Sequence, residues 1–159
     1  GNIGATNVYR VAGKLAGILT LLGDTMKSFL PLLAINTWLA PTPTQLGIAC
    51  AVAILGHCYP IYLKFEGGKG VATALGIFLV ISPKAVLVAL IIFVLTVVIP
   101  RYISLGSVLA ALSAPLLILL FNHPQAIFLA TLFIALLVTW RHHSNIQRLL
   151  DGTENRFKA

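Results

Sequence analysis

The sequence predicts an all-α fold, a polytopic helical bundle that crosses a membrane several times. The mean hydropathy is +0.97. Only 9% of the 159 residues are charged, whereas 58% are hydrophobic. Apolar runs close to the roughly 20 residues that a helix needs to cross a bilayer recur along the chain. We therefore expect a single transmembrane domain over residues 1–159 and no soluble domain of useful size.

Six apolar segments can be assigned as membrane spans. Their approximate bounds are 13–39, 44–63, 71–82, 85–100, 105–121 and 126–140. The third is shorter than the roughly 17 residues that form the lower limit for a helical span. Irregular backbone at membrane depth is tolerated only where protein or water surrounds it, so the loop before this segment is expected to line a cavity. The tail at 145–150 is expected to form a short interfacial amphipathic helix.

The distribution of basic residues predicts the orientation. If the N-terminal end, two turns and the tail share one side, that side holds nine of the eleven Lys and Arg: Arg10, Lys14, Lys64, Lys69, Arg101, Arg141, Arg148, Arg156 and Lys158. Lys84 falls on the other side and Lys27 inside a span. The positive-inside rule places the nine-charge side in the cytoplasm. The net charge of +7 therefore requires no nucleic acid partner.

The loop between the second and third segments has an unusual composition, Glu66-Gly67-Gly68-Lys69-Gly70-Val71-Ala72. Glycine lets backbone N–H groups turn toward a ligand without obstruction, and a lysine adds a positive point charge. This combination suits an anionic oxygen cluster such as a phosphate. The loop is not a P-loop, because Leu63 and Gly70 stand where that motif requires glycine and Ser or Thr. A flexible basic turn is the alternative interpretation.

Polar residues also gather before the first span and after the last one. The first group contains Asn2, Thr6, Asn7 and Arg10, and arginine binds phosphate through a planar fork of donors. An ordinary polar loop with an interfacial arginine is the alternative. The last group reads Arg141-His142-His143-Ser144-Asn145-Ile146, followed by Gly152-Thr153-Glu154.

His142 and Asn145 are three residues apart, so on a helix they would share a face. Such a pair can hold a hydroxyl-bearing substrate or orient a proton; a solvated basic tail is the alternative. His57 is either a buried histidine beside a proline bend or a catalytic group. Two adjacent histidines are too few to indicate a metal site.

Asp24 and Lys27 lie inside the first span, three residues apart. Each would cost roughly 2.5–3.5 kcal/mol at the membrane centre if it were unpaired. We therefore expect the two side chains to pair and to face the bundle interior. The pair is either structural or part of a substrate site.

In this order, the motifs resemble the bacterial acyl-phosphate:glycerol-3-phosphate acyltransferase family, PlsY. The resemblance covers essentially the whole chain. It rests on Gly1–Asn7 with Arg10, Gly56-His57 through Gly67–Thr73, Arg141-His142 through Asn145-Ile146, Gly152–Glu154 and the Asp24-x-x-Lys27 pattern. The family has one more span upstream, seven in all, and a Gly-Ser pair just before the residue that is Gly1 here. The resemblance therefore implies that the natural protein continues upstream.

The resemblance implies an activity and a location. Members transfer a fatty acyl group from acyl phosphate to the sn-1 hydroxyl of glycerol 3-phosphate, which gives lysophosphatidic acid and phosphate and is the first acylation step of phospholipid synthesis. They use neither acyl-CoA nor acyl carrier protein, and no cofactor or metal is expected. The protein would be a multi-pass protein of the bacterial cytoplasmic (inner) membrane, with its active site facing the cytoplasm.

Chemistry and resemblance together suggest residue roles. Arg10 and Lys69 would bind the phosphates, with further donors from Asn2, Thr6, Asn7, His57 and the amides of Gly67, Gly68 and Gly70. His142, Asn145 and Lys69 would be catalytic, and Asp24, Lys27 and Glu154 would support the site. The proton acceptor stays open among His142, His57 and a substrate phosphate.

Two other function classes compete with an acyltransferase. A small membrane transporter of organic anions would use Asp24, Lys27 and the broken third span as a substrate path. It does not explain why the polar motifs share one side. A membrane-anchored scaffold without activity is a third class, and the glycine loop argues against it.

Overall fold

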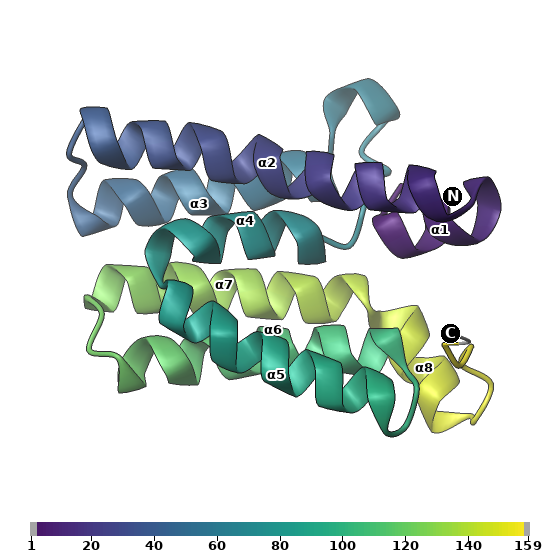
Figure 1. The fold of residues 1–159 in the computed structure, drawn as a ribbon. Helices are drawn as coiled ribbons and strands as arrows, with labels where there is room; N and C mark the ends of the chain where they lie inside the picture. Colours follow the sequence, from purple (N-terminus) through teal and green to yellow (C-terminus); the bar gives the residue numbers. More distant parts are fainter. Residues whose placement is uncertain (1–2, 158–159) are drawn as a thin grey trace. The chain divides into compact units, whose positions relative to one another are not determined.

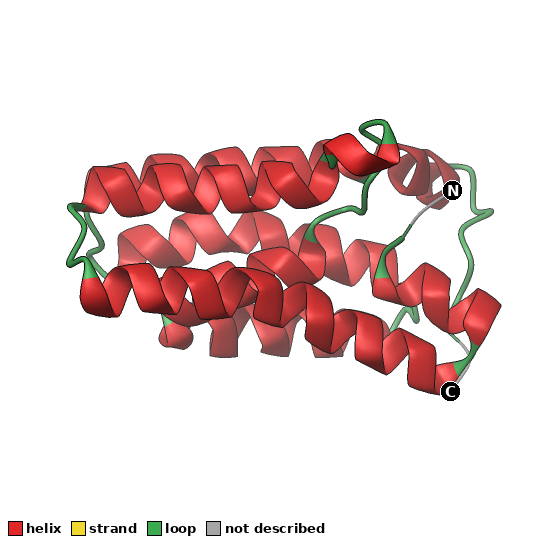
Figure 2. Cartoon of the chain, turned by 90° about the horizontal axis from the view of Figure 1, so that it is seen from above, coloured by secondary structure: helices red, strands yellow, loops and turns green. Residues whose placement is uncertain are grey.

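The computed structural model describes residues 3–157, and every regular element in that range is a helix (Figures 1 and 2). This confirms the predicted all-α class. The elements are α1 (Ala5–Ala12), α2 (Lys14–Trp38), α3 (Pro43–Cys58), the 3-10 turn η1 (Ile61–Leu63), α4 (Val71–Ile81), α5 (Pro83–Val98), α6 (Ile103–Leu120), α7 (Gln125–Arg141) and α8 (His143–Leu150).

The six apolar segments correspond to helices α2 to α7, with ends within a few residues of the expected bounds. By length and composition, α2, the segment 43–63 and α6 can each cross a membrane, and α7 with α8 forms a pair bent by 58°. Helices α4 and α5 are apolar but shorter. The chain is thus a multi-pass helical membrane protein, and the count of six spans stays a prediction.

The polar segment before the first span, for which an ordinary loop was the alternative interpretation, forms the short helix α1, which packs on α2. The helix that was expected over 145–150 is α8; it begins at His143 and follows α7 after the single residue His142.

Two compact units make up the chain, residues 1–81 and 82–159. Unit 1 contains α1 to α4, and unit 2 contains α5 to α8.

Small residues allow close helix packing in unit 1. A Cβ atom on Gly76 of α4 would collide with the Thr25 carbonyl and the Ser28 hydroxyl of α2. The Ser28 hydroxyl donates a hydrogen bond to the Thr73 carbonyl at 2.8 Å. Gly17 of α2 lies against the backbone of Tyr9 in the same way. The short helices α1 and α4 are therefore both held on α2, the longest helix of this unit (Figure 1).

Side-chain caps and prolines mark the first residues of helices α3 and α5. Thr42 caps α3 in a reciprocal capping box with Gln45, and Pro43 occupies the first helical position. Ser82 accepts a hydrogen bond from the Ala85 amide and caps α5. Each cap supplies an acceptor for an amide in the first turn of its helix.

Helix α6 packs against both α5 and α7 in unit 2. Ile118 of α6 and Ile134 and Val138 of α7 are fully buried in its core. The segment after α8 returns to the turn between α5 and α6, where the Phe157 amide donates to the Arg101 carbonyl at 2.6 Å. The Arg156 guanidinium also donates to the Tyr102 hydroxyl at 3.2 Å. The C-terminal segment is thereby attached to the start of α6.

Candidate functional site

The N-terminal polar motif places its cation on a helix. Asn2 lies outside the described residues. Thr6 and Asn7 are half-buried on α1, and Arg10 is exposed in its last turn. Residues three and four apart are neighbours on a helix surface, so all three side chains point to one side of α1. This arrangement can present a guanidinium and two polar groups to an anion.

The glycine loop is held against the end of α3. The amides of Gly67 and Gly68 donate to the carbonyls of Cys58 and His57 at 3.2 and 3.3 Å. A Cβ atom on Gly67 would collide with the His57 carbonyl, and one on Gly68 with the His57 ring. These two glycines are required because the backbone of α3 approaches so closely.

This geometry changes one expectation. The amides of Gly67 and Gly68 were expected to face a phosphate, but they donate to protein carbonyls, since the loop has to satisfy its own backbone groups against α3. The first-turn amides of a helix, by contrast, have no partner inside the helix. Gly70 lies at the start of α4 with φ of 85°, and half-buried Lys69 precedes it. A helix N-terminus beside a lysine is a suitable anion site.

A cluster of three polar side chains lies beside this loop. Lys27 Nζ is 2.6 Å from Asp24 Oδ1, which confirms the predicted pairing. Lys27 Nζ is also 2.7 Å from His57 Nδ1, a contact that the sequence did not suggest. The Thr73 hydroxyl donates to the Asp24 carbonyl at 3.3 Å. The cluster therefore connects α2, α3 and α4.

The three side chains of this cluster differ in how much they are exposed to solvent. The His57 side chain is 2% exposed, whereas that of Asp24 is 13% and that of Lys27 is 42% exposed. The expectation that the ion pair faces the bundle interior thus holds better for Asp24 than for Lys27. The ammonium group of Lys27 contacts both partners, although its side chain is partly exposed.

A second cluster, in unit 2, is centred on Glu154. Its Oε1 atom accepts hydrogen bonds from the Ser104 hydroxyl and from Asn145 Nδ2, both at 2.7 Å. Its Oε2 atom accepts from Arg148 Nε at 2.8 Å. The Glu154 side chain is only 4% exposed. The carboxylate thus joins α6, α8 and the C-terminal segment.

These donors explain the ionisation of Glu154. Burial by itself would raise the pKa of this carboxyl group. The hydrogen bonds from Asn145, Ser104 and Arg148, together with the positive charge of Arg148, outweigh that effect and hold the pKa below its ordinary value. Glu154 is therefore a carboxylate near neutral pH, with both oxygens satisfied.

His142 occupies the junction between α7 and α8 and is buried. Its Nδ1 atom is 2.7 Å from the Val138 carbonyl. A carbonyl oxygen only accepts, so Nδ1 holds a hydrogen, and Nε2 of the neutral ring is an acceptor. Asn145 lies three residues later, and its amide donates to Glu154. The structure thus orients both residues through hydrogen bonds within unit 2.

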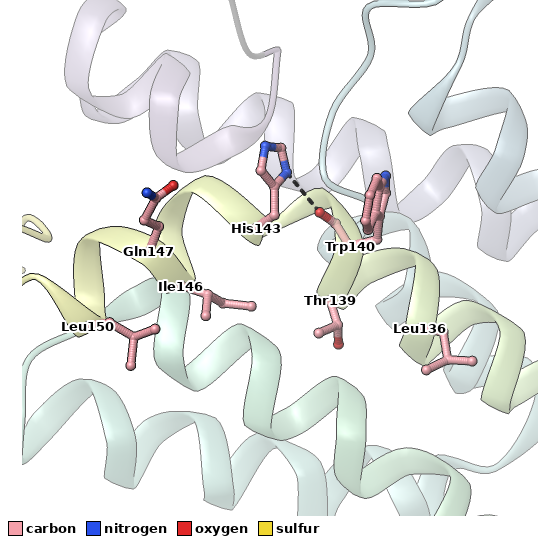
Figure 3. A pocket seen from close by; sticks show the side chains of 7 residues that line it. All are labelled: Leu136, Thr139, Trp140, His143, Ile146, Gln147 and Leu150. Carbon is pink, nitrogen blue, oxygen red and sulfur yellow. Dashed lines mark hydrogen bonds between the residues drawn. The ribbon is translucent and has the colours of Figure 1, made fainter.

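An apolar groove of about 590 Å³ lies along the bend between α7 and α8 (Figure 3). Its lining side chains are Leu136, Thr139, Trp140, His143, Ile146, Gln147 and Leu150. The His143 ring is tethered to the Trp140 carbonyl at 3.0 Å, as Figure 3 shows. A groove of this size and polarity can accommodate an alkyl chain.

Sequence reasoning missed three of these partners. Ser104 and Arg148 bind Glu154, and His57 binds Lys27. A serine near the start of an otherwise apolar helix and an arginine six residues before a glutamate were weak signals for the first two. The third joins residues 30 positions apart, and no local pattern indicates it.

Fold and clusters together define a class, the helical integral membrane proteins with cationic, hydrogen-bonding sites suited to phosphate-bearing ligands. The sequence model of a family described as glycerol-3-phosphate acyltransferase matches residues 1–152. The chain belongs to this family of acyltransferases.

Individual proteins with the same description are similar to this chain over almost all of its length. A glycerol-3-phosphate acyltransferase of Syntrophotalea carbinolica is 57% identical over 100% of this chain and 81% of its own length. One of Trichlorobacter lovleyi is 51% identical with the same coverage. Two crystal structures of PlsY, described as an integral membrane glycerol 3-phosphate acyltransferase, are 38% identical over 99% of this chain. The lysophosphatidic acid form gives a TM-score of 0.92 over 81% of that chain, and the glycerol 3-phosphate form 0.94 over 79%.

Glu154→Gln should lower the melting temperature in detergent. The substitution removes a buried charge that accepts three hydrogen bonds, and bonds to charged groups contribute about 1.5–3 kcal/mol each. The lowered pKa means that the stabilisation is present above the pKa of the unfolded chain and is lost as pH falls through the folded value. The melting difference between wild type and variant should therefore shrink on acidification. Asp151→Asn, an exposed change in the same segment, is the control, and equal effects of the two variants would contradict the assignment.

Proposed function

We propose that this chain transfers a fatty acyl group from acyl phosphate to the sn-1 hydroxyl of glycerol 3-phosphate, with release of lysophosphatidic acid and inorganic phosphate. The observation that carries the proposal is the family match over residues 1–152. The solved relatives described as glycerol 3-phosphate and lysophosphatidic acid forms give the proposal its acceptor and its product. The acyl phosphate donor is inferred from the chemistry of the sites.

Both substrates contain a phosphate, and the cations of unit 1 are suited to bind it. In this proposal Lys69, beside the N-terminus of α4, and Arg10, on α1, each contact a phosphate, with Asn2, Thr6 and Asn7 as further donors. At about 4 Å and an effective dielectric constant near 20, one cation–anion contact contributes roughly 4 kcal/mol before desolvation. Two such contacts are enough to hold a small dianion.

His142 and Asn145 are proposed to hold the glycerol moiety or the second phosphate. Both are pre-oriented, His142 by the Val138 carbonyl and Asn145 by Glu154. Lys69 is also proposed as a catalytic group, because its charge would stabilise the departing phosphate. The acyl tail would lie along an apolar groove, at about 0.8 kcal/mol for each buried CH2 group.

The acyl phosphate is a mixed anhydride and is already activated. Catalysis can therefore rest on alignment of the acceptor hydroxyl with the carbonyl carbon and on stabilisation of the leaving phosphate. The hydroxyl oxygen forms the new ester bond, the C–O bond to phosphate breaks, and the hydroxyl proton goes to Nε2 of His142 or to a phosphate oxygen. No covalent enzyme intermediate is required.

We place the chain in the bacterial cytoplasmic membrane, with the sites on the cytoplasmic side. The support is the positive-inside rule, applied to the nine Lys and Arg that share one side in the predicted topology. A transporter of organic anions is not favoured, because the family to which the chain belongs is one of acyltransferases.

Lys69→Ala in the full-length protein should nearly abolish acyl transfer while the protein stays folded in detergent. The lysine lies between two glycines, so neither chain neighbour can replace its charge. Lysophosphatidic acid formation from labelled glycerol 3-phosphate is the readout. Lys84→Ala, which removes an exposed lysine at the start of α5, is the control. Activity of the Lys69 variant within about threefold of wild type, less than one strong ionic contact would cost, would refute the role.

Arg10→Lys should raise the KM for glycerol 3-phosphate. Lysine keeps the positive charge but loses the planar fork that binds phosphate in a bidentate way. This KM is measured from initial rates at varied concentrations of glycerol 3-phosphate and saturating acyl phosphate. An unchanged KM would show that Arg10 is an interfacial anchor.

The purified full-length protein should use palmitoyl phosphate and release inorganic phosphate in one-to-one ratio with lysophosphatidic acid, and it should not use palmitoyl-CoA. Short turns between apolar helices leave little surface for a carrier protein or for an adenine nucleotide, whereas an acyl phosphate needs only a phosphate site near an apolar groove. Comparable rates with palmitoyl-CoA would overturn the donor assignment.

A further inference from the structure

The contact between Lys27 and His57 has no role in the mechanism above, and it fixes the state of the histidine. Lys27 Nζ lies 2.6 Å from Asp24 Oδ1, which favours the ammonium form, and 2.7 Å from His57 Nδ1. An ammonium only donates hydrogen bonds. His57 Nδ1 therefore accepts, and the neutral ring holds its hydrogen on Nε2.

Other states of the ring fit this contact poorly. A hydrogen on Nδ1 would point at an ammonium group at hydrogen-bond distance. Asp24 Oδ1 is 3.7 Å from Nδ1, beyond hydrogen-bond distance, so the carboxylate does not replace Lys27 as the direct partner of the ring. The His57 side chain is 2% exposed, which prevents the ring from exchanging this partner freely with water.

The opposite edge of the ring faces the glycine loop. Of the atoms that a Cβ on Gly68 would meet, His57 Nε2 is the nearest. The Gly68 amide also donates to the His57 carbonyl at 3.3 Å. His57 thus contacts the residue before Lys69 through both its ring and its backbone. A change in ring orientation would move the loop directly.

We propose that Lys27 is a positioning residue that acts through His57. It holds the ring as the Nε2–H tautomer, so that a hydrogen-bond donor faces the Gly68 side of the loop and Lys69 is set for a phosphate-bearing substrate. His57 is then a donor at this edge and not the general base. Asp24 fixes the ammonium group of Lys27 and balances its charge. The kinetic consequence rests on the proposed function, whereas the tautomer does not.

Nitrogen-15 NMR of histidine-labelled full-length protein in detergent tests the tautomer directly. The His57 signals, assigned by their loss in His57→Gln, should show an unprotonated Nδ1 and a protonated Nε2. In Lys27→Met the signals should shift toward a mixture of tautomers. Lys14→Met, an exposed change at the start of the same helix, should leave them unchanged. A wild-type ring that is protonated at Nδ1, or no shift in Lys27→Met, would overturn the proposal.

Kinetics separates positioning from a structural role. Lys27→Met leaves Asp24 without its cation and should lower the melting temperature, whereas Asp24→Asn with Lys27→Met leaves no uncompensated charge and should recover much of it. The KM for glycerol 3-phosphate should stay about tenfold raised in the double variant, with kcat within about threefold of wild type. Glycerol 3-phosphate is affected first because it has no apolar tail to anchor it.

The outcomes are distinguishable. If the double variant recovers both stability and KM, the pair is only structural and the proposal fails. If wild-type protein makes no lysophosphatidic acid while the NMR result is as expected, the proposed function fails and the link from Lys27 to His57 stands. Strictly additive melting shifts of Asp24→Asn and Lys27→Met would show that the two charges are not directly coupled, which would also overturn the role assigned to Asp24.

Discussion

A charged side chain on a helix that crosses hydrocarbon needs a partner, or contact with protein or water. Asp24 and Lys27 meet this requirement in α2, and the geometry of unit 1 follows from it. The side of α2 with this pair faces α3 and α4, where the Asp24 carbonyl accepts from Thr73 and the Lys27 ammonium reaches His57. Once α3 is placed in this way, its last residues hold the glycine loop. The ion pair is thus linked, through His57, to the loop that contains Gly67 and Gly68.

Unit 2 also contains a charged group with several polar partners, but here the charged group accepts hydrogen bonds, whereas Lys27 donates them. Its buried group is the carboxylate of Glu154, and three donors from two helices converge on it. Because Ser104, Asn145 and Arg148 all donate to this one carboxylate, it ties the C-terminal segment to α6 and α8 and orients Asn145. In both units a charged group bonds to a polar side chain and gives it a fixed direction, as a pre-organised site requires.

Sequence reasoning succeeded where the determining interactions are local. Hydropathy placed α2 to α7 within a few residues, and the spacing of Asp24 and Lys27 predicted their pairing. It made no prediction of α1, because a short polar segment has little intrinsic helix stability and depends on packing against Gly17. It failed for the long-range partners His57 and Ser104, and it assigned to a ligand two loop amides that the backbone of α3 uses. Residue type indicated which groups can bind a ligand or take part in catalysis. Only the fold determines which of them are already hydrogen-bonded within the protein.

The crowding around the glycine loop has a consequence for the evolution of drug resistance. Resistance by point mutation usually requires that a contact residue can change size while the enzyme still works. At Gly67 and Gly68 every substitution adds an atom that collides with His57, so mutants at these positions would have to rebuild the end of α3 as well. Gly67 and Gly68 are buried and their amides already donate to the end of α3, so resistance mutations would have to arise at other positions around the site.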